Sequence, residues 1–401
     1  MVGIGLARVI LPRLQVLADL ILPESQCGFR YHRSTIDMIF THRQLREKCL
    51  EQREPLIVVF IDLTKAFDMV CRGGLFAILQ RLGCPDTMLS IISGFHNHMQ
   101  ASVHYNGSTS KAFPVTRGVK QGCVLAPTLF AIYFSALLLC AFSSTSSVLL
   151  HSRSSGKLFN LSRFMARSET RRVFIRELLY ADDAALVAHS IADTQVLCNS
   201  FAAACIDFGM KISLSKSVVL VQGVSDPVTI TINNVVSKVV EKFCYLGSNV
   251  TASGSLVSEL DARIGTAAST FGKLRSRVWA NQHLLIHVKI RVYVVCVLGM
   301  LLYGCETWLK YRYQEKGSTR SISAAYDPSS VSLGMTVYQI LQLWRELVLP
   351  IYSLSLKYIE YAGVAMCAEW KMVGFRRTSC MGNYSLLPDL SVAPNSATRT
   401  Y

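Results

Sequence analysis

Two adjacent aspartates, Asp182 and Asp183, stand inside a short apolar segment, and no other feature limits the fold of this chain as strongly. Residues 178–179 and 184–187 on either side are apolar, which predicts two buried strands joined by a tight turn. Two ionised carboxylates in such a place are costly unless a cation compensates them, and a divalent metal ion is the natural candidate. A turn with a purely structural role explains the pair equally well at this point.

A third carboxylate follows another apolar run. Residues 56–61 are rich in β-branched side chains, as is typical of a strand buried on both faces, and they end at Asp62. Asp68 lies shortly beyond. Three carboxylates at adjacent strand ends are what two Mg²⁺ ions, roughly 4 Å apart, need for phosphoryl transfer. Alternatively, Asp62 caps a helix that begins at Thr64, which leaves the aspartate pair unexplained.

Local patterns predict the elements around these strands. Residues 101–115 read as a hairpin that turns at Asn106 and Gly107. Ser190 and Asp193 resemble a capping box that opens a helix, and Gly209 suits the position just after its end. A strand over residues 217–221 and a loop over 223–227 separate a second region. That region contains a long helix with one apolar face over residues 256–278 and basic residues elsewhere on it, which suit solvent or nucleic acid about equally.

The net charge of +15 favours a polyanionic partner, although charge alone equally suits a membrane surface. The 13 cysteines include no C-x-x-C pair and no spacing suited to zinc, and they are typical of reduced thiols in an intracellular protein. The N-terminus does not resemble a secretory signal. We therefore expect an intracellular protein, in the nucleus or cytoplasm, that is not secreted.

Residues 121–150 contain no charged side chain, so a membrane span has to be considered. Pro127 and the serine-rich residues 143–147 leave only about 15 strongly apolar residues, short of the roughly 20 that cross a bilayer. This segment is better explained as a buried helix. Residues 293–303 form a shorter apolar segment, which we expect to belong to the core. No stable membrane association is predicted.

Several ordered motifs resemble the reverse transcriptases of non-LTR (LINE-like) retrotransposons. The resemblance spans residues 7–308, and the motifs agree with that family in order and spacing. The matching segments are the fingers motif at residues 26–30 and 33–35, motif A at 60–68, motif B at 118–127, motif C at 180–183, motif D at 209–216, and residues 245–247, which lead to the thumb.

The resemblance implies an α+β fold with the right-hand palm of polymerases, an antiparallel sheet with packed helices. It implies partial fingers over residues 1–54, a palm over 55–247 that includes inserted fingers and helical segments, and a helical thumb over 248–308. Residues 309–401 stop resembling the family and are expected to be a divergent, poorly ordered tail. Relatives usually begin with an endonuclease domain and longer fingers, so we expect a truncated chain that cannot nick a target for priming.

The resemblance also assigns roles at the metal site. Asp62 and Asp182 would hold two Mg²⁺ ions, with Mn²⁺ as an alternative, Asp183 would be a weaker ligand, and the backbone carbonyl of Leu63 would add an oxygen. Phe67 matches the steric gate, where an aromatic ring collides with a ribose 2′-OH, so the implied substrate is a dNTP. An arbitrary phenylalanine on an amphipathic turn is more often a core residue.

The remaining roles concern the nucleotide. Gln121 and Gly122 would line the pocket under the incoming nucleotide, although Gly122 also suits a simple turn. The cations implied for the triphosphate are Arg30, Arg33 and Lys65. Lys216 would donate a proton to pyrophosphate, and a solvated lysine is the alternative.

The implied function is RNA-directed DNA synthesis, in which a primer 3′-OH attacks a dNTP opposite an RNA template. The implied partners are therefore an RNA template, a DNA primer and dNTPs, and the oligomeric state is left open. Two other readings compete with this one. The first is a noncatalytic retrotransposon remnant with residual nucleic-acid binding, and the second is a small membrane protein built on residues 121–150.

Overall fold

The computed structural model describes residues 2–142, 148–153, 170–224 and 226–308. The described residues divide into two compact units, one formed mainly by residues 2–151 and 172–241 and the other mainly by residues 242–308. The first unit holds the fingers segment and the palm segment together, so the predicted boundary between residues 54 and 55 stays a prediction. The predicted tail, residues 309–401, lies outside the described residues.

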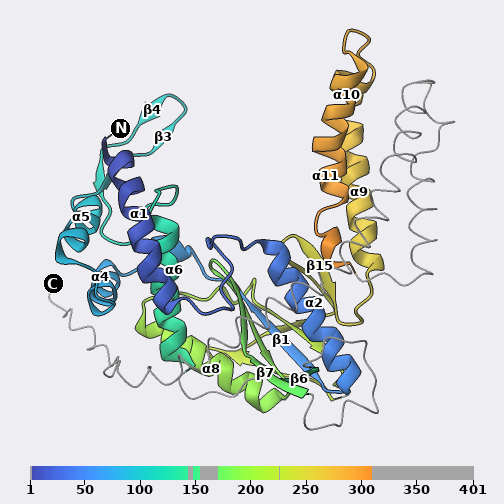
Figure 1. The fold of residues 1–401 in the computed structure, drawn as a ribbon, viewed down its shortest axis with the longest axis horizontal. Coiled ribbons are helices and arrows are strands. Elements are labelled where there is room, and N and C mark those ends of the chain that lie inside the picture. Colours follow the sequence, from blue (N-terminus) through green and yellow to red (C-terminus); the bar gives the residue numbers. More distant parts are fainter. Residues whose placement is uncertain (1, 143–147, 154–169, 225, 309–401) are drawn as a thin grey trace. The chain divides into compact units, whose positions relative to one another are not determined.

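A five-stranded sheet organises the first unit (Figure 1). Its strand order is β13-β10-β1-β9-β8, and every neighbouring pair is antiparallel except β10 with β13. The strands are β1 (Leu56–Ile61), β8 (Glu177–Tyr180), β9 (Asp183–Ala188), β10 (Val218–Gln222) and β13 (Lys238–Val240). All six residues of β1 are buried, because this strand has a partner on each edge and helices on each face. The predicted α+β class and the predicted central strand are confirmed.

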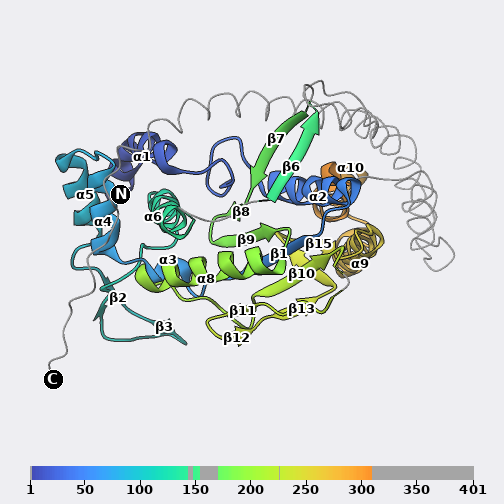
Figure 2. The same ribbon diagram turned by 90° about the horizontal axis from the view of Figure 1, so that it is seen from below.

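The two faces of β1 enter different parts of the core, because successive side chains of a strand alternate. Ile57, Val59 and Ile61 pack into the large apolar cluster that α6 (Ala126–Ala141) and α8 (Ile191–Asp207) also line. Phe60 points the other way, and its ring centroid lies 5.9 Å from that of His42 on α2 (Thr35–Gln52). Figures 1 and 2 show α2 on one side of the sheet and α6 with α8 on the other.

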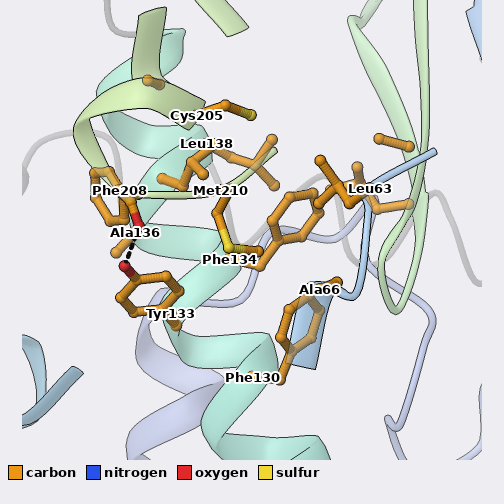
Figure 3. Packing of buried hydrophobic residues seen from close by; sticks show 14 of the residues in the cluster. Leu63, Ala66, Phe130, Tyr133, Phe134, Ala136, Leu138, Cys205, Phe208 and Met210 are labelled. Atoms are coloured by element: carbon orange, nitrogen blue, oxygen red, sulfur yellow. Dashed lines mark hydrogen bonds between the residues drawn. The ribbon is translucent and has the colours of Figure 1, made fainter. Parts of the chain in front are cut away.

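Helix α6 is the centre of the main core (Figure 3). Phe130, Tyr133 and Phe134 are each at most 1% exposed, and the Tyr133 hydroxyl donates a 2.6 Å hydrogen bond to the Phe208 carbonyl at the end of α8. The helix α1 (Val2–Ile21) also packs on α6. The uncharged segment that begins at residue 121 therefore contains a core helix as far as residue 142, as predicted. Residues 143–147 lie outside the described part of the chain.

The predicted caps and turns are present. Ser190 Oγ accepts a 3.0 Å hydrogen bond from the Asp193 amide at the start of α8, and Gly209 follows the helix end with φ of +67°. Asn106 and Gly107, both with positive φ, join β3 to β4. The expected separation at loop 223–227 is wrong, because β13 returns to pair with β10 and the first unit extends to Glu241.

Short elements complete the first unit. They are α3 (Ala66–Met69), α4 (Arg72–Arg81), α5 (Asp86–His96), β2 (Gln100–Ala101), β3 (His104–Tyr105), β4 (Ser108–Thr109), β5 (Phe113–Pro114), β11 (Thr231–Ile232) and β12 (Val235–Val236). In addition, β6 (Val148–Arg153) and β7 (Thr170–Ile175) form a two-stranded sheet.

The second unit is a hairpin followed by helices. Its elements are β14 (Lys242–Tyr245), β15 (Ser248–Thr251), α9 (Val257–Lys273), the π-helical η1 (Arg275–Trp279), α10 (Ile286–Val292), the π-helical η2 (Tyr293–Leu298), α11 (Gly299–Leu301) and the 3-10 helix η3 (Cys305–Thr307). Its small core joins Ala267 and Trp279 to Tyr293, Val297 and Leu301. The predicted long helix is confirmed to Lys273, and the wider turns of the π-helical η1 follow at Arg275.

The apolar segment at residues 293–303 is only partly core, so that expectation needs correction. Tyr293, Val297 and Leu301 are buried, whereas Val294, Val295 and Met300 are exposed. Among the described residues, the helical stretch His287–Thr307, with 21 residues and a mean hydropathy of 1.8, is the one stretch long and apolar enough to cross a membrane by length and composition. A one-sided core explains the mixture, because a helix that packs on a single neighbour buries only one face.

Candidate active site

The sheet register brings the three aspartates to one end of the sheet. Ile61 pairs with Ala184, so Asp62 follows β1 beside Asp183, the first residue of β9. Tyr180 pairs with Asp183, which leaves Ala181 and Asp182 as a two-residue turn. This is the tight turn that two neighbouring carboxylates need in order to share a site.

Backbone contacts fix the segment that carries Asp62. The Asp62 carbonyl accepts a 2.8 Å hydrogen bond from the Ser213 amide, and the Asp62 amide donates to Ser217 Oγ at 3.3 Å. Leu63 forms an isolated bridge with Ile212 and is buried. The N-cap position of the short helix α3 is Lys65, so Asp62 is not a helix cap.

Lys216 places a cation beside this end of the sheet. Its Nζ lies 3.5 Å from Asp62 Oδ2, and its side chain is 71% exposed. An exposed ion pair of this kind stabilises the fold little. The lysine is therefore free to exchange the Asp62 carboxylate for another anion, which fits the predicted role toward pyrophosphate without testing it.

The three carboxylates interact electrostatically. Partial burial, followed by the charges of Asp182 and Asp62, raises the pKa of Asp183 to about 6, although its side chain keeps exposed surface. Partial burial also raises the pKa of Asp182, with a smaller contribution from Asp62. Carboxylates that share a site disfavour one another's ionised form, and a nearby cation reverses this effect. A bound cation would therefore stabilise the ionised forms of these carboxylates.

The donor set fits Mg²⁺, which prefers hard carboxylate and carbonyl oxygens. In the part of the chain that the structure describes, no three His, Cys, Asp or Glu side chains lie close enough together to form a ready metal-ligand cluster. Because Asp62, Asp182 and Asp183 repel one another, we expect a divalent cation to draw their side chains inward. Their backbones are already in place at adjoining strand ends.

The raised pKa of Asp183 predicts how stability depends on pH in the absence of divalent metal. The folded state holds a proton on this carboxyl more tightly than the unfolded state, in which the pKa is near 3.8. The contribution of Asp183 to stability is therefore fully present below pH 3.8 and is lost as pH rises through about 6. Urea unfolding in EDTA across this range should show a smaller decline for Asp183→Asn than for the wild type. Identical pH slopes for the two proteins would contradict the prediction.

Phe67 belongs to an aromatic row that connects the site to the core. Its ring stacks on Phe130 with centroids 4.5 Å apart, and the Phe29 ring approaches its edge at 6.1 Å. Phe130 in turn stacks on Phe134 at 5.7 Å. Phe67 is half-buried, so one part of the ring packs in the core and another stays accessible. The two interpretations of this residue, gate and core, are compatible.

The segment with Gln121 and Gly122 is held against the segment with Phe67. The Val119 amide donates to the Phe67 carbonyl at 3.0 Å, and the Gly118 amide donates to the Val70 carbonyl at 2.9 Å. Gln121 and Gly122 are exposed, and Gly122 has φ of +83°. Both therefore lie in an accessible loop that is hydrogen-bonded to the segment of Phe67, and their contact with a nucleotide stays a prediction.

Arg72, to which the sequence assigned no role, organises that loop. Its guanidinium donates to the carbonyls of Gly118 at 2.8 Å, Val115 at 2.9 Å and Arg117 at 3.1 Å, and also to that of His96 at 2.7 Å. An arginine that binds three carbonyls of one loop and a fourth at the end of α5 fixes the backbone conformation of that loop. No sequence pattern marks it, because its partners are backbone atoms.

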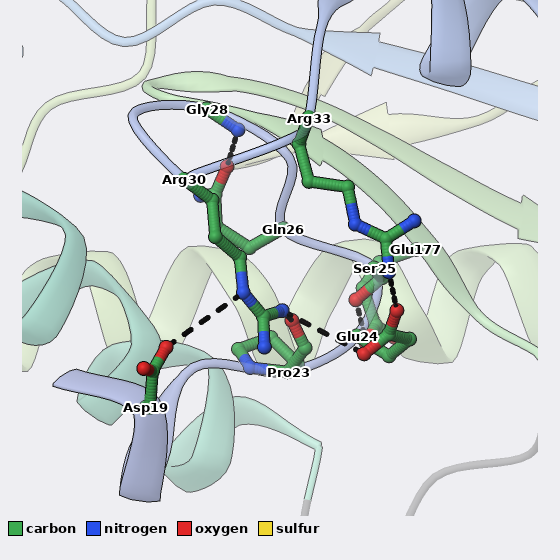
Figure 4. A network of polar contacts seen from close by, with 9 residues as sticks. All are labelled: Asp19, Pro23, Glu24, Ser25, Gln26, Gly28, Arg30, Arg33 and Glu177. Atoms are coloured by element: carbon green, nitrogen blue, oxygen red, sulfur yellow. Dashed lines mark hydrogen bonds and ion pairs between the residues drawn. The ribbon is translucent and has the colours of Figure 1, made fainter. Parts of the chain in front are cut away.

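The arginines implied for the triphosphate have acidic partners of their own (Figure 4). Arg30 lies 3.7 Å from Glu24 and 3.9 Å from Asp19, and it donates to the Pro23 carbonyl at 3.2 Å. Arg33 forms an ion pair with Glu24. Lys65, by contrast, is exposed and has φ of +49°. Of the three cations, Lys65 is thus the one that no described carboxylate engages in an ion pair, and the triphosphate assignment stays a prediction.

Comparison with known proteins identifies similar sequences. A family model described as reverse transcriptase (RNA-dependent DNA polymerase) matches residues 5–250. The RNA-directed DNA polymerase from mobile element jockey of Drosophila melanogaster is 32% identical over 130 residues, which are 32% of this chain and 14% of that protein. A probable RNA-directed DNA polymerase from transposon BS of the same fly is 25% identical over 300 residues, which are 72% of this chain and 30% of that protein.

A Pol polyprotein from the type-1 retrotransposable element R2 of Popillia japonica is 35% identical over 99 residues, 24% of this chain and 14% of that protein. The chain thus spans between 14% and 30% of the length of these relatives. Among solved structures, apo telomerase from Candida tropicalis is similar over 89% of this chain and 60% of the telomerase chain. The sequence identity is 12% and the TM-score is 0.40.

Proposed function

Because the chain belongs to the reverse transcriptase (RNA-dependent DNA polymerase) family, we propose that its first unit is the catalytic core of an RNA-directed DNA polymerase from a non-LTR retrotransposon. The observation that carries this proposal is the position of Asp62, Asp182 and Asp183 at one end of the central sheet. The reaction is transfer of a dNTP onto a primer 3′-OH opposite an RNA template. We also propose that the protein acts inside the cell, in the nucleus or cytoplasm.

Asp62 and Asp182 would bind two Mg²⁺ ions, or Mn²⁺, with Asp183 and the Leu63 carbonyl as further oxygen ligands. When bound there, the two metals would lower the pKa of the primer 3′-OH and offset charge on the triphosphate oxygens. The protein's own share of the work is placement: the strand ends hold the carboxylates, and the contacts of Ser213 and Ser217 fix the backbone of Asp62.

Other side chains would act on the nucleotide. Lys216, which is 3.5 Å from Asp62, would move its proton from Nζ to the leaving pyrophosphate. Gln121, Gly122 and Lys65 would contact the base and triphosphate from exposed loops. Arg30 and Arg33 would first have to leave Glu24. Template and primer would bind through their phosphates, giving affinity that falls with salt.

Phe67 provides a test of sugar selection. Replacing Phe67 by Ala should raise the kcat/KM for a ribonucleotide relative to the matching deoxyribonucleotide by about tenfold or more, because the ring no longer meets the 2′-OH. The ratio is insensitive to the fraction of active protein, so partial destabilisation from the lost stacking on Phe130 does not obscure it. Phe113→Ala, which removes an exposed ring on β5, is the matched control. An unchanged ratio in Phe67→Ala would refute the gate.

Primer extension tests the proposal as a whole. Purified chain, Mg²⁺, a DNA primer on an RNA template and dNTPs should give product that Asp182→Ala abolishes. Omission of the RNA template controls for DNA-templated or untemplated addition. If wild type gives no more product than Asp182→Ala, the polymerase proposal fails, and a noncatalytic remnant with residual nucleic-acid binding is the remaining reading.

A further inference from the structure

Gln26 is a buried glutamine whose side chain hydrogen-bonds to Ala181, the residue that precedes the aspartate pair. Its side chain is 0% exposed, and its amide bonds to both polar backbone groups of Ala181. Nε2 donates to the Ala181 carbonyl at 3.1 Å, and Oε1 accepts from the Ala181 amide at 3.0 Å. Oε1 accepts a further bond from the Gly28 amide at 2.8 Å. Three hydrogen bonds thus converge on one amide group.

Ala181 needs such support because of its conformation. It has φ of +56°, a left-handed region that costs a non-glycine residue about 1–2 kcal/mol. It is 6% exposed, and as part of a two-residue turn it lies outside the pairing of β8 with β9. Buried backbone groups left without partners are strongly unfavourable. Gln26 supplies the hydrogen-bond partners that the pairing of β8 with β9 does not provide at Ala181.

The segment around Gln26 also packs tightly on the same turn. The Leu179 amide donates to the Ser25 carbonyl and the Cys27 amide donates to the Leu179 carbonyl, both at 3.0 Å. A Cβ on Gly28 would lie only 2.0 Å from the Ala181 nitrogen, so the two backbones are in direct contact. Gln26 therefore forms an isolated parallel bridge with Leu179 of β8, and its side chain reaches the turn from this position.

We propose that Gln26 is a positioning residue that sets the metal affinity of Asp182 and Asp183 by holding the backbone of their turn. The inference rests on the proposed function and adds a residue to it. Glutamine suits the task because its side chain ends in one donor and one acceptor, which match the carbonyl and the amide of Ala181. Glutamate would keep the acceptor but set a second oxygen against the Ala181 carbonyl, and methionine has the length but neither strong hydrogen-bonding group.

Metal binding by the full chain tests the proposal. Mn²⁺ titration, with free Mn²⁺ followed by electron paramagnetic resonance, should show binding at least about tenfold weaker in Gln26→Met than in wild type. Gln26→Glu should also bind more weakly, despite its added negative charge. Primer extension with dNTPs should show reduced kcat at fixed Mn²⁺ with little change in the KM for dNTP, and additional Mn²⁺ should restore kcat.

Gln222→Met is the matched control. Gln222 is also buried, exchanges hydrogen bonds with Arg46, and pairs with Leu56 at the end of β1 that is remote from Asp62. Both methionine variants should lower the thermal midpoint, but only the change at Gln26 should weaken Mn²⁺ binding. If Gln26→Met does not fold, Gln26→Glu serves as the test variant.

The outcomes separate this inference from the proposed function. Mn²⁺ affinity equal to wild type in the Gln26 variants would overturn the positioning role while leaving the metal site intact. Equal weakening in Gln222→Met would overturn it as well, because the effect would then come from general destabilisation. If wild type itself bound no Mn²⁺, the metal site on which the proposed function depends would be wrong, and the positioning role would fall with it.

Discussion

Replacing Asp62 by Asn should reduce primer extension by about 10³-fold or more, an effect comparable to the loss expected for Asp182→Ala. The substitution preserves shape but removes a negative charge from a site that we propose to bind two divalent ions, and metal charge stabilisation contributes several kcal/mol to phosphoryl transfer. It should also lower the pKa of Asp183, because the charge of Asp62 is one of the causes that raise it. Single-turnover primer extension measures the rate, and carboxyl NMR titration measures the pKa.

Asp207→Asn is the control for Asp62→Asn. Asp207 is an exposed carboxylate at the end of α8 in the same unit, and its replacement should leave the extension rate within about twofold of wild type. Comparable thermal midpoints for the two variants would show that the loss is chemical. An Asp62→Asn protein that retains more than a tenth of the wild-type rate would contradict the central role given to this residue.

Replacing Gly28 by Ala should cost about 3 kcal/mol of folding free energy or more, the largest stability effect expected for so small a change. The added Cβ would lie 2.0 Å from the Ala181 nitrogen and 2.9 Å from the Tyr180 carbonyl carbon, and both are backbone atoms that cannot rotate away. The turn would have to move, so metal binding should weaken together with stability. Urea unfolding followed by circular dichroism gives the free energy.

Gly94→Ala provides the opposite expectation for the same substitution. Gly94 is an exposed glycine within α5, and a Cβ there meets no atom within 4 Å. Alanine should therefore stabilise the protein by about 0.5–1 kcal/mol through helix propensity. A Gly28→Ala protein as stable as Gly94→Ala would show that residues 25–28 do not pack on the turn as described.

The sequence predicts well those features that short-range physics determines. The strand before Asp62, the cap at Ser190 and the turn at Asn106 and Gly107 all depend on a few consecutive residues, and all are confirmed. The uncharged residues 121–150 hold too few strongly apolar residues for a membrane span, which predicts a buried helix, and α6 confirms it as far as residue 142.

Long-range contacts with backbone atoms could not be predicted. Gln26 and Arg72 bind backbone carbonyl and amide groups, which carry no sequence signature, so the sequence assigns no role to Arg72 and places Gln26 only within the fingers motif. The ion pair of Arg33 with Glu24 was likewise missed, because separation in sequence does not fix how two side chains orient. The exposed face of residues 293–303 depends on how few neighbours the second unit supplies.

The central position of β1 has a consequence for synthesis of the chain. Both of its partners, β9 and β10, come much later in the sequence, so a growing chain releases an apolar strand with two open edges well before either partner exists. Pairing across such a sequence distance is slow, and an unpaired apolar edge is prone to join another chain. A ribosome that stalls after α6 would thus produce a fragment in which both edges of β1 are still unpaired, and only the later strands β9 and β10 close them.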